Sequence, residues 1–316
     1  MRPLPWTWLP RRLAALDPVA DSDEVMRLLA EHQLNDTIVA MTLLVTTAQT
    51  ALPPHASATL LGTGKLLHRG EQRHTDGRDF LVTWFVHGAR SPETAASVER
   101  LNRYHLGLAR RFPGAFGDND DYVYTLCAIG AFVPRMRETL GLPPQPEHLD
   151  VAWHRFLADL AALFRGEHGP VSGFPEDMAG MRRVVEEFEA RPWPRSDDGR
   201  VLVAGMVQQF CDRYFPRPVQ WFGRAQVLLL MPPRVREVHG QGDPRPVPAA
   251  LVRWSMRLVI RAQDTWWPTR RTPLSVRLAS PRVRAAHARR AARMERVHAR
   301  RLRRGELPPP PVRPHG

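Results

Sequence analysis

The chain has 316 residues, of which 43% are hydrophobic and 24% charged, a composition typical of globular proteins and apolar enough for a core that encloses a ligand. Its two cysteines, Cys127 and Cys211, are too few for a disulfide framework or a four-cysteine metal site. We therefore expect a reducing, cytoplasmic location. The net charge of +13 is uneven, because residues 281–316 hold eleven arginines and two glutamates, a charge of +9, which leaves +4 for residues 1–280.

The pattern of apolar residues predicts an all-α fold, a multi-helix globular bundle with one main domain over residues 21–280. Residues 1–20 are expected to form an N-terminal extension, and residues 1–12 lack the continuous apolar region of a secretory signal. Residues 281–316 are rich in arginine and proline with few large apolar side chains, so we expect a disordered basic tail. The alternative is a solvated helix followed by an extended polyproline stretch.

Helices are expected from the start of the main domain. A short helix is predicted over residues 21–32, and Asp36 is expected to cap a longer one over residues 37–52. The longer helix is uncharged and rich in threonine, but it falls short of the roughly 20 apolar residues of a membrane span, so we expect a buried core helix. Residues 79–87 form an apolar run that fits either a helix or a buried strand.

The segment Ser91-Pro92-Glu93 is typical of a helix start, with a serine cap, a proline in the first turn and an acidic residue near the positive end of the helix dipole. That helix is expected to run to about residue 111. Residues 118–121 begin another helix that ends near residue 140. Further helices are expected over residues 147–165, 178–190, 199–214, 219–230 and 247–267.

The helix that begins after Ser91 carries the most informative histidine of the chain. Val98, Leu101, His105 and Leu108 are spaced by three, four and three positions, so they share one face. A neutral imidazole on an apolar face can ligate a metal ion or a haem iron. It can equally be a core histidine that is hydrogen-bonded to a carbonyl group.

Four segments resemble motifs of one oxygenase family. The run over residues 98–105 resembles an R-h-N-x-x-H motif, and residues 64–66 with 71–76 resemble a G-K … K-R-x-x-D-T region. Residues 118–126 resemble an acidic helix start, and residues 230–237 resemble a late P-x-x-h-R segment. Their order and spacing over roughly residues 30–265 are similar to those of the family of fungal MpaB oxygenases and bacterial latex-clearing proteins, the rubber oxygenases.

The resemblance implies a haem pocket inside the helical bundle and a b-type haem as cofactor. It makes His105 the axial ligand of the iron, with Asn102 and Lys65 as further cofactor-binding residues. It places Arg73 and Thr75 at the catalytic, oxygen-binding side or near the haem propionates. The implied partners are O2 and an apolar small molecule such as an isoprenoid chain.

One motif departs from the family pattern, because the D-T pair is inverted here as Thr75-Asp76. The other interpretation of Arg73 and Thr75 is a helix cap beside a surface arginine. Two further hypotheses therefore stay open. The chain can be a catalytically silent helical protein, or its basic tail can bind nucleic acid without sequence specificity or contact an anionic membrane surface.

Overall fold

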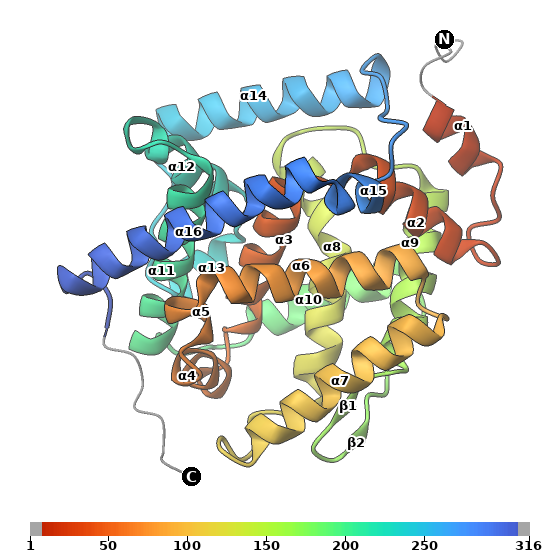
Figure 1. The fold of residues 1–316 in the computed structure, drawn as a ribbon. Coiled ribbons are helices and arrows are strands. Elements are labelled where there is room, and N and C mark those ends of the chain that lie inside the picture. Colours follow the sequence, from red (N-terminus) through yellow and green to blue (C-terminus); the bar gives the residue numbers. More distant parts are fainter. Residues whose placement is uncertain (1–7, 309–316) are drawn as a thin grey trace.

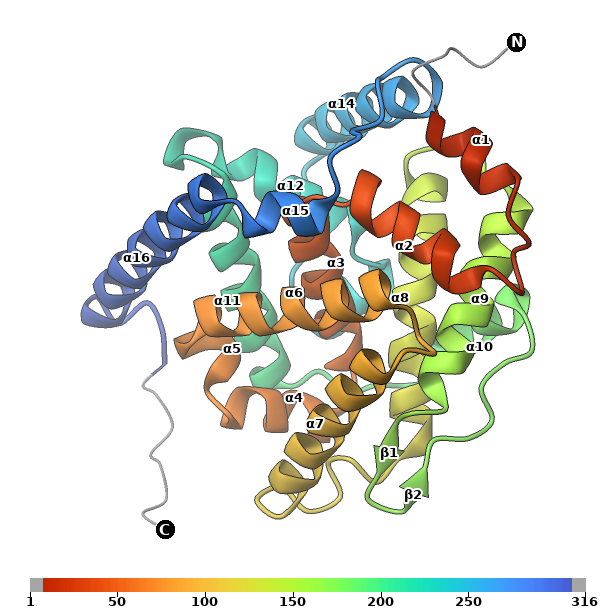
Figure 2. The same ribbon diagram turned by 45° about the vertical axis from the view of Figure 1, so that its right-hand side comes forward.

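The computed structural model describes residues 8–308 and consists almost entirely of helices, as Figure 1 and Figure 2 show. The prediction of an all-α fold is confirmed. The first half of the described chain contains α1 (Trp8–Ala14), α2 (Ser22–Gln33), α3 (Asp36–Thr50), α4 (Pro54–Gly62), α5 (Lys65–His68), α6 (Gly70–His87), α7 (Pro92–Ala109), α8 (Asn119–Thr139) and α9 (Glu147–Ala161).

The second half begins with a short antiparallel hairpin of β1 (Arg165–Gly166) and β2 (Gly169–Pro170). The remaining elements are α10 (Met178–Ala190), α11 (Asp197–Tyr214), the 3-10 turn η1 (Arg217–Val219), α12 (Gln220–Leu230), α13 (Pro233–Val238), α14 (Pro246–Thr265), α15 (Leu274–Ala279) and α16 (Pro281–Arg303). No helix among residues 8–308 is long and apolar enough to cross a membrane.

Helix α3 runs through the middle of the molecule and contacts α6, α8, α11 and α12. Its apolar side chains point in several directions and are nevertheless buried, as Val39, Met41, Val45 and Ala48 are each at most 2% exposed. A helix that is apolar on nearly all sides is stable only inside a core. The expectation of a buried core helix is therefore confirmed.

The expected cap of this helix is wrong by one residue. Asn35, not Asp36, caps α3, because its side-chain oxygen accepts hydrogen bonds from the backbone N–H groups of Thr37 and Ile38 at 3.1 and 3.0 Å. Either residue type can cap a helix, so the sequence alone does not decide between neighbours. Asp36 is thus free to bind side chains from other helices.

The predicted start of α7 is confirmed, because the Ser91 side chain accepts a hydrogen bond from the Thr94 N–H at 3.1 Å. The chain reaches this start through Gly88, whose φ of +89° favours glycine. A Cβ at Gly88 would collide with the side chain of Asp23, which accepts a hydrogen bond from the Ala89 N–H at 2.8 Å. This corner fixes the direction of α7 relative to α6, and the undecided residues 79–87 belong to α6.

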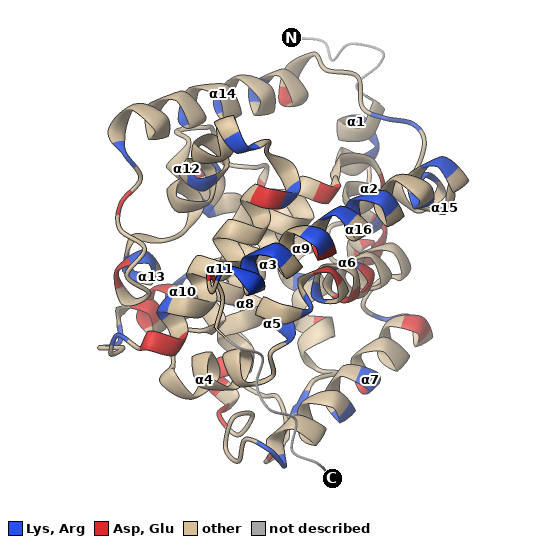
Figure 3. Cartoon of the chain, turned by 60° about the vertical axis from the view of Figure 1, so that its left-hand side comes forward, with Lys and Arg blue, Asp and Glu red and all other residues tan. Residues whose placement is uncertain are grey.

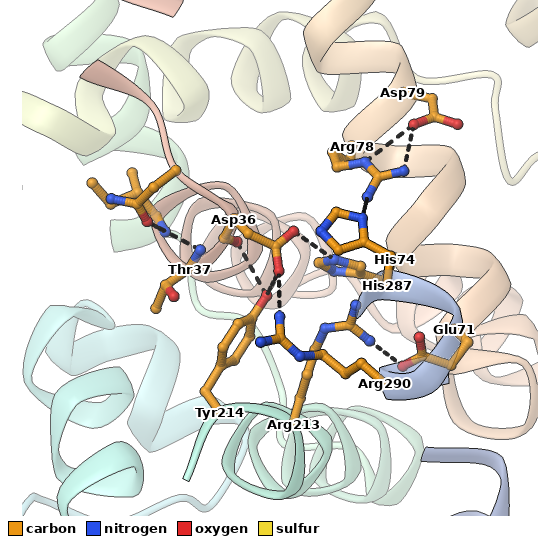
Figure 4. Close-up of polar contacts among 12 residues, drawn as sticks. Asp36, Thr37, Glu71, His74, Arg78, Asp79, Arg213, Tyr214, His287 and Arg290 are labelled. Carbon is orange, nitrogen blue, oxygen red and sulfur yellow. Dashed lines mark hydrogen bonds and ion pairs between the residues drawn. The ribbon is translucent and has the colours of Figure 1, made fainter. Parts of the chain in front are cut away.

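Residues 281–303 are helical and packed, so the expectation of a disordered tail is wrong for them. Their solvated face is rich in arginine, but Met294 is 7% exposed and α16 lies against α6 and α11. Arg290 pairs with Asp36 at 3.1 Å and Arg301 with Asp212 at 2.9 Å, as Figure 4 shows for Arg290. Residues 309–316 of the expected tail lie outside the described residues.

Part of the expected N-terminal extension also belongs to the body. Leu9 and Leu13 of α1 are buried and pack against Val25 and Leu28 of α2 and Ala152 of α9. Residues 1–7 lie outside the described part of the chain.

Candidate functional site

A cavity of about 690 Å³ lies between helices α3 to α8. This volume is within the range of about 300–1,000 Å³ that is usual for ligand-binding pockets. Most of its wall is apolar, and examples are Leu43, Leu66, Phe80, Leu101 and Phe116. The polar groups come from helices α3 to α8 and include threonines, a histidine and charged side chains. An apolar cavity with a few convergent polar groups is the arrangement expected of a small-molecule site.

His105 of α7 is part of the wall of this cavity. Its ring stacks on Phe116, with ring centres 4.7 Å apart and an angle of 19° between the planes. Burial lowers the pKa of His105 to about 4, so the imidazole is neutral at neutral pH. Its Nδ1 atom is buried without a hydrogen-bond partner among the described residues. His105 is therefore not a core histidine satisfied by a carbonyl group.

Arg73 of α6 also faces the cavity. Burial lowers the pKa of its guanidinium, and the nearby Asp76 and Tyr104 oppose this effect. An arginine remains charged under such conditions. Its side chain donates a hydrogen bond to Thr47 Oγ1 at 3.3 Å. Gly77, one turn further along α6, leaves room for the guanidinium, because a Cβ there would collide with Arg73 Nη1.

Lys65 reaches the cavity from α5. Its Nζ atom forms an ion pair with Asp76 at 2.6 Å and lies 5.2 Å from the centre of the Tyr104 ring. The cavity wall therefore holds three cationic side chains, from Lys65, Arg73 and Arg100, and three carboxylates, from Asp76, Asp79 and Asp121. Their formal charges cancel, and the Lys65 ammonium is neutralised locally by its ion pair with Asp76.

The structure brings together Lys65, Arg73 and His105, but it does not bring Thr75 or Asn102 to the cavity. The side chain of Thr75 is exposed on the outside of α6. Asn102 is 2% exposed; its amide nitrogen donates to Leu163 O at 2.9 Å, and its oxygen accepts from the Arg165 N–H at 3.3 Å. Asn102 therefore joins α7 to the start of the hairpin.

Threonines of α3 line the cavity and were missed by sequence reasoning. Thr46, Thr47 and Thr50 face it, and Thr50 Oγ1 lies 3.2 Å from Thr125 Oγ1 of α8. With Leu43 they follow the spacing of three, four and seven that places residues on one helix face. This spacing is a signal that the sequence contains, although the threonines were interpreted only as part of a buried helix.

A second cavity of about 410 Å³ abuts the first, and both share Leu43, Thr47, Leu66 and Arg73 in their walls. Its outer wall includes Met294 and His298 of α16, opposite His68 of α5 and Arg213 of α11. The rings of His68 and His298 are 5.6 Å apart at an angle of 75°. The basic C-terminal helix is thus one wall of a cavity.

Figure 4 shows how α16 is held beside this second cavity. The Asp36 carboxylate accepts hydrogen bonds from Tyr214 at 2.9 Å and Arg290 at 3.1 Å, and it lies 3.2 Å from His74 Nε2. Burial alone would raise the pKa of Asp36, but the contacts with His74 and Tyr214 outweigh burial and hold it well below its ordinary value. In addition, Arg78 Nη1 lies 2.9 Å from His287 Nδ1 of α16.

Within residues 8–308, no group of three or more histidine, cysteine, aspartate or glutamate side chains could hold a metal ion. No protein-family model matches the chain, and no curated protein is significantly similar to it. The geometry offers a single neutral histidine in a cavity whose surface is mostly apolar and whose three cationic side chains are balanced by three carboxylates.

Proposed function

We propose that this chain is a haem b-dependent oxygenase that acts on an apolar small molecule, with the cavity between α3 and α8 as its site. The observation that carries the proposal is His105, a half-buried and neutral imidazole whose buried Nδ1 atom has no hydrogen-bond partner among the described residues, on the wall of a mostly apolar cavity. A neutral imidazole is the form that ligates haem iron.

The residues present fit such a group. His105 would provide the single protein ligand, and the leucine and phenylalanine side chains of the wall would contact an apolar ring system. Lys65, Arg73 and Arg100 line the same cavity and would pair with carboxylate groups. Haem b, when bound, supplies the redox iron for O2 chemistry. The resemblance to MpaB and latex-clearing oxygenases supports the same cofactor and favours an isoprenoid substrate.

One contact departs from what metal-binding histidines usually have. A ligating histidine commonly donates its second ring N–H to a carboxylate or carbonyl group, which fixes the ring and raises its basicity. The described residues place no acceptor at Nδ1 of His105. The stacking on Phe116 is the contact that fixes the ring plane instead.

Other side chains of the cavity would bind the substrate, exclude water and stabilise negative charge. The apolar wall would bind the substrate and exclude bulk water, which strengthens the electrostatic interactions inside the cavity. The half-buried Arg73 guanidinium would stabilise an anionic group near the site through charge-assisted hydrogen bonds. Gly77 keeps the space that the guanidinium needs.

The test is the ultraviolet–visible spectrum of the full chain produced with a haem precursor, compared with His105→Ala. We expect a Soret band in the parent protein that is lost or strongly weakened in the variant. His87→Ala is the matched control, because His87 is exposed at the end of α6 and should leave the band unchanged. Far-ultraviolet circular dichroism shows whether each variant is folded. A folded parent protein without a band, or a band unchanged in His105→Ala, would refute the proposal.

A second candidate function is nonspecific nucleic-acid binding by the C-terminal helix α16. Arg282, Arg289, Arg296 and Arg303 are exposed on α16, and Figure 3 shows this helix as the most densely basic element. Such binding would weaken strongly with salt, because phosphate contacts release counterions. Replacement of these four arginines by glutamine should weaken binding to duplex DNA and reduce its salt dependence in a shift assay; unchanged binding would eliminate this candidate.

A colourless, folded chain that also fails to bind nucleic acid would point to the catalytically silent alternative. The inverted Thr75-Asp76 pair and the exposure of Thr75 are the observations that favour it.

A further inference from the structure

Helix α14 presents an apolar stripe to the outside of the molecule. Val247, Leu251, Trp254 and Leu258 are 79%, 44%, 64% and 55% exposed. Their spacing of four, three and four positions places them on one face of the helix. Figure 1 and Figure 2 show α14 at the edge of the molecule, with one side turned away from the body. A contiguous exposed stripe of large apolar side chains marks an interaction surface more often than isolated exposed residues do.

The fold does not need this stripe. The opposite face of α14 packs against α12 and the end of α8, where Val252 is fully buried and Met256 and Ile260 contact Leu140 and Leu229. The inner face therefore holds the helix in place. The outer face is presented on a fixed scaffold, so substitutions there should leave the core intact.

Positive charge lies along one side of the stripe. Arg253, Arg257 and Arg261 lie on α14 itself, and Figure 3 shows basic residues along the helix. The helix has one acidic residue, Asp264, whose carboxylate is paired with Arg137 at 2.9 Å. The neighbouring loops add three exposed arginines, Arg245, Arg270 and Arg271, and the exposed Trp267. A basic rim repels a second copy of the same surface and attracts an anionic partner.

The stripe itself narrows the choice of anionic partner. Duplex nucleic acid offers phosphates but no apolar layer in which leucine and valine can be buried. A bilayer with anionic headgroups offers both, with acyl chains for the stripe and headgroups for the arginines. Tryptophan favours the boundary between these layers. Amphipathic helices that lie in this boundary combine arginine on one face with tryptophan and leucine on the other.

We propose that α14 docks this protein on the surface of an anionic lipid bilayer, with Val247, Leu251, Trp254 and Leu258 in the interfacial layer. The helix lies parallel to the membrane plane, and the arginines on one flank of the stripe contact the headgroups. This assignment does not depend on the proposed haem chemistry.

The experiment is flotation of the full chain with vesicles of phosphatidylcholine alone or of phosphatidylcholine with one part in three phosphatidylserine. We expect binding to the anionic vesicles that falls by at least about tenfold in the double variant Trp254→Gln, Leu258→Gln, which leaves the net charge unchanged. Val19→Gln is the matched control, because Val19 is also half exposed, at 50%, but lies between α1 and α2.

Each other outcome overturns the proposal. The first is no binding of the parent protein to anionic vesicles, and the second is equal binding of the double variant. A third is equal binding to neutral vesicles, which would remove the role of the arginines. Light scattering measures the oligomeric state of the parent protein and of the double variant. A dimeric parent protein and a monomeric double variant would show that the stripe binds a second copy of the chain. Circular dichroism confirms that the double variant is folded.

Discussion

Asp36 joins three helices, so its replacement by asparagine tests how the C-terminal helix is held. The carboxylate accepts hydrogen bonds from Tyr214 of α11 and Arg290 of α16 and contacts His74 of α6. A hydrogen bond to a charged group is worth about 1.5–3 kcal/mol, and the half-exposed Arg290 pair about 0–1 kcal/mol. The Tyr214 hydroxyl keeps a second acceptor, the Asp36 carbonyl at 3.1 Å. We therefore expect Asp36→Asn to lower the free energy of unfolding by about 2–3 kcal/mol.

The assay is urea denaturation at several pH values. The pKa of Asp36 is lowered in the folded protein, so its stabilisation is complete above the unfolded value of about 3.9 and is lost as the pH falls toward the folded value. The difference between the parent and Asp36→Asn should therefore be full at pH 7 and shrink below about pH 4.

Asp79→Asn is the matched control, because the Asp79 carboxylate is 61% exposed and pairs only with its neighbour Arg78. It should change the free energy of unfolding by less than about 1 kcal/mol. The reasoning is refuted if Asp36→Asn costs no more than Asp79→Asn, or if its cost does not depend on pH.

Three smaller changes test the surroundings of the cavity. Gly88→Ala should lower the free energy of unfolding by about 1–3 kcal/mol in urea denaturation, because alanine disfavours the positive φ and its Cβ would collide with Asp23. An unchanged midpoint of unfolding would contradict this prediction. Asn102→Ala should lower the free energy of unfolding by about 1–3 kcal/mol but leave any Soret band unchanged, because the hydrogen bonds of its side chain within the described residues are to backbone groups near the hairpin. Loss of the band in a folded variant would show that Asn102 takes part in cofactor binding. Gly77→Ala should displace the Arg73 guanidinium and weaken haemin binding in a spectroscopic titration, whereas unchanged binding would show that Arg73 is not needed there.

The local signals of the sequence predicted much of the fold. Ser91 and Asp118 each cap the helix that they were expected to begin, because a short polar side chain binds the free N–H groups of the first turn whatever the tertiary context. The stripe of Val98, Leu101, His105 and Leu108 also faces inward, with the first residue in the core and the other three at the cavity. Periodicity within one helix was sufficient for these statements.

Contacts between distant segments were not predictable in this way. Nothing near Asp36 in the sequence indicates that Tyr214 and Arg290 bind it, and these residues are separated from it by 178 and 254 positions. The composition of residues 281–303 resembles that of disordered chains, because arginine contributes little to a core. The helix is stabilised by ion pairs to buried or half-buried carboxylates of the body, and composition does not report such pairs.

The packing of α16 links two hypotheses that the sequence left separate. Removal of residues 281–316 would test nucleic-acid binding, but it would also remove Met294 and His298 from the wall of the second cavity. Because that cavity shares Arg73 with the first, the same deletion would also change the surroundings of the proposed haem site. If the truncated chain lost both nucleic-acid binding and haem binding, the two losses could not be assigned to separate causes. Substitution of the exposed arginines alone keeps α16 in place, so it separates the charge on the outer face from the packing of α16 against the second cavity.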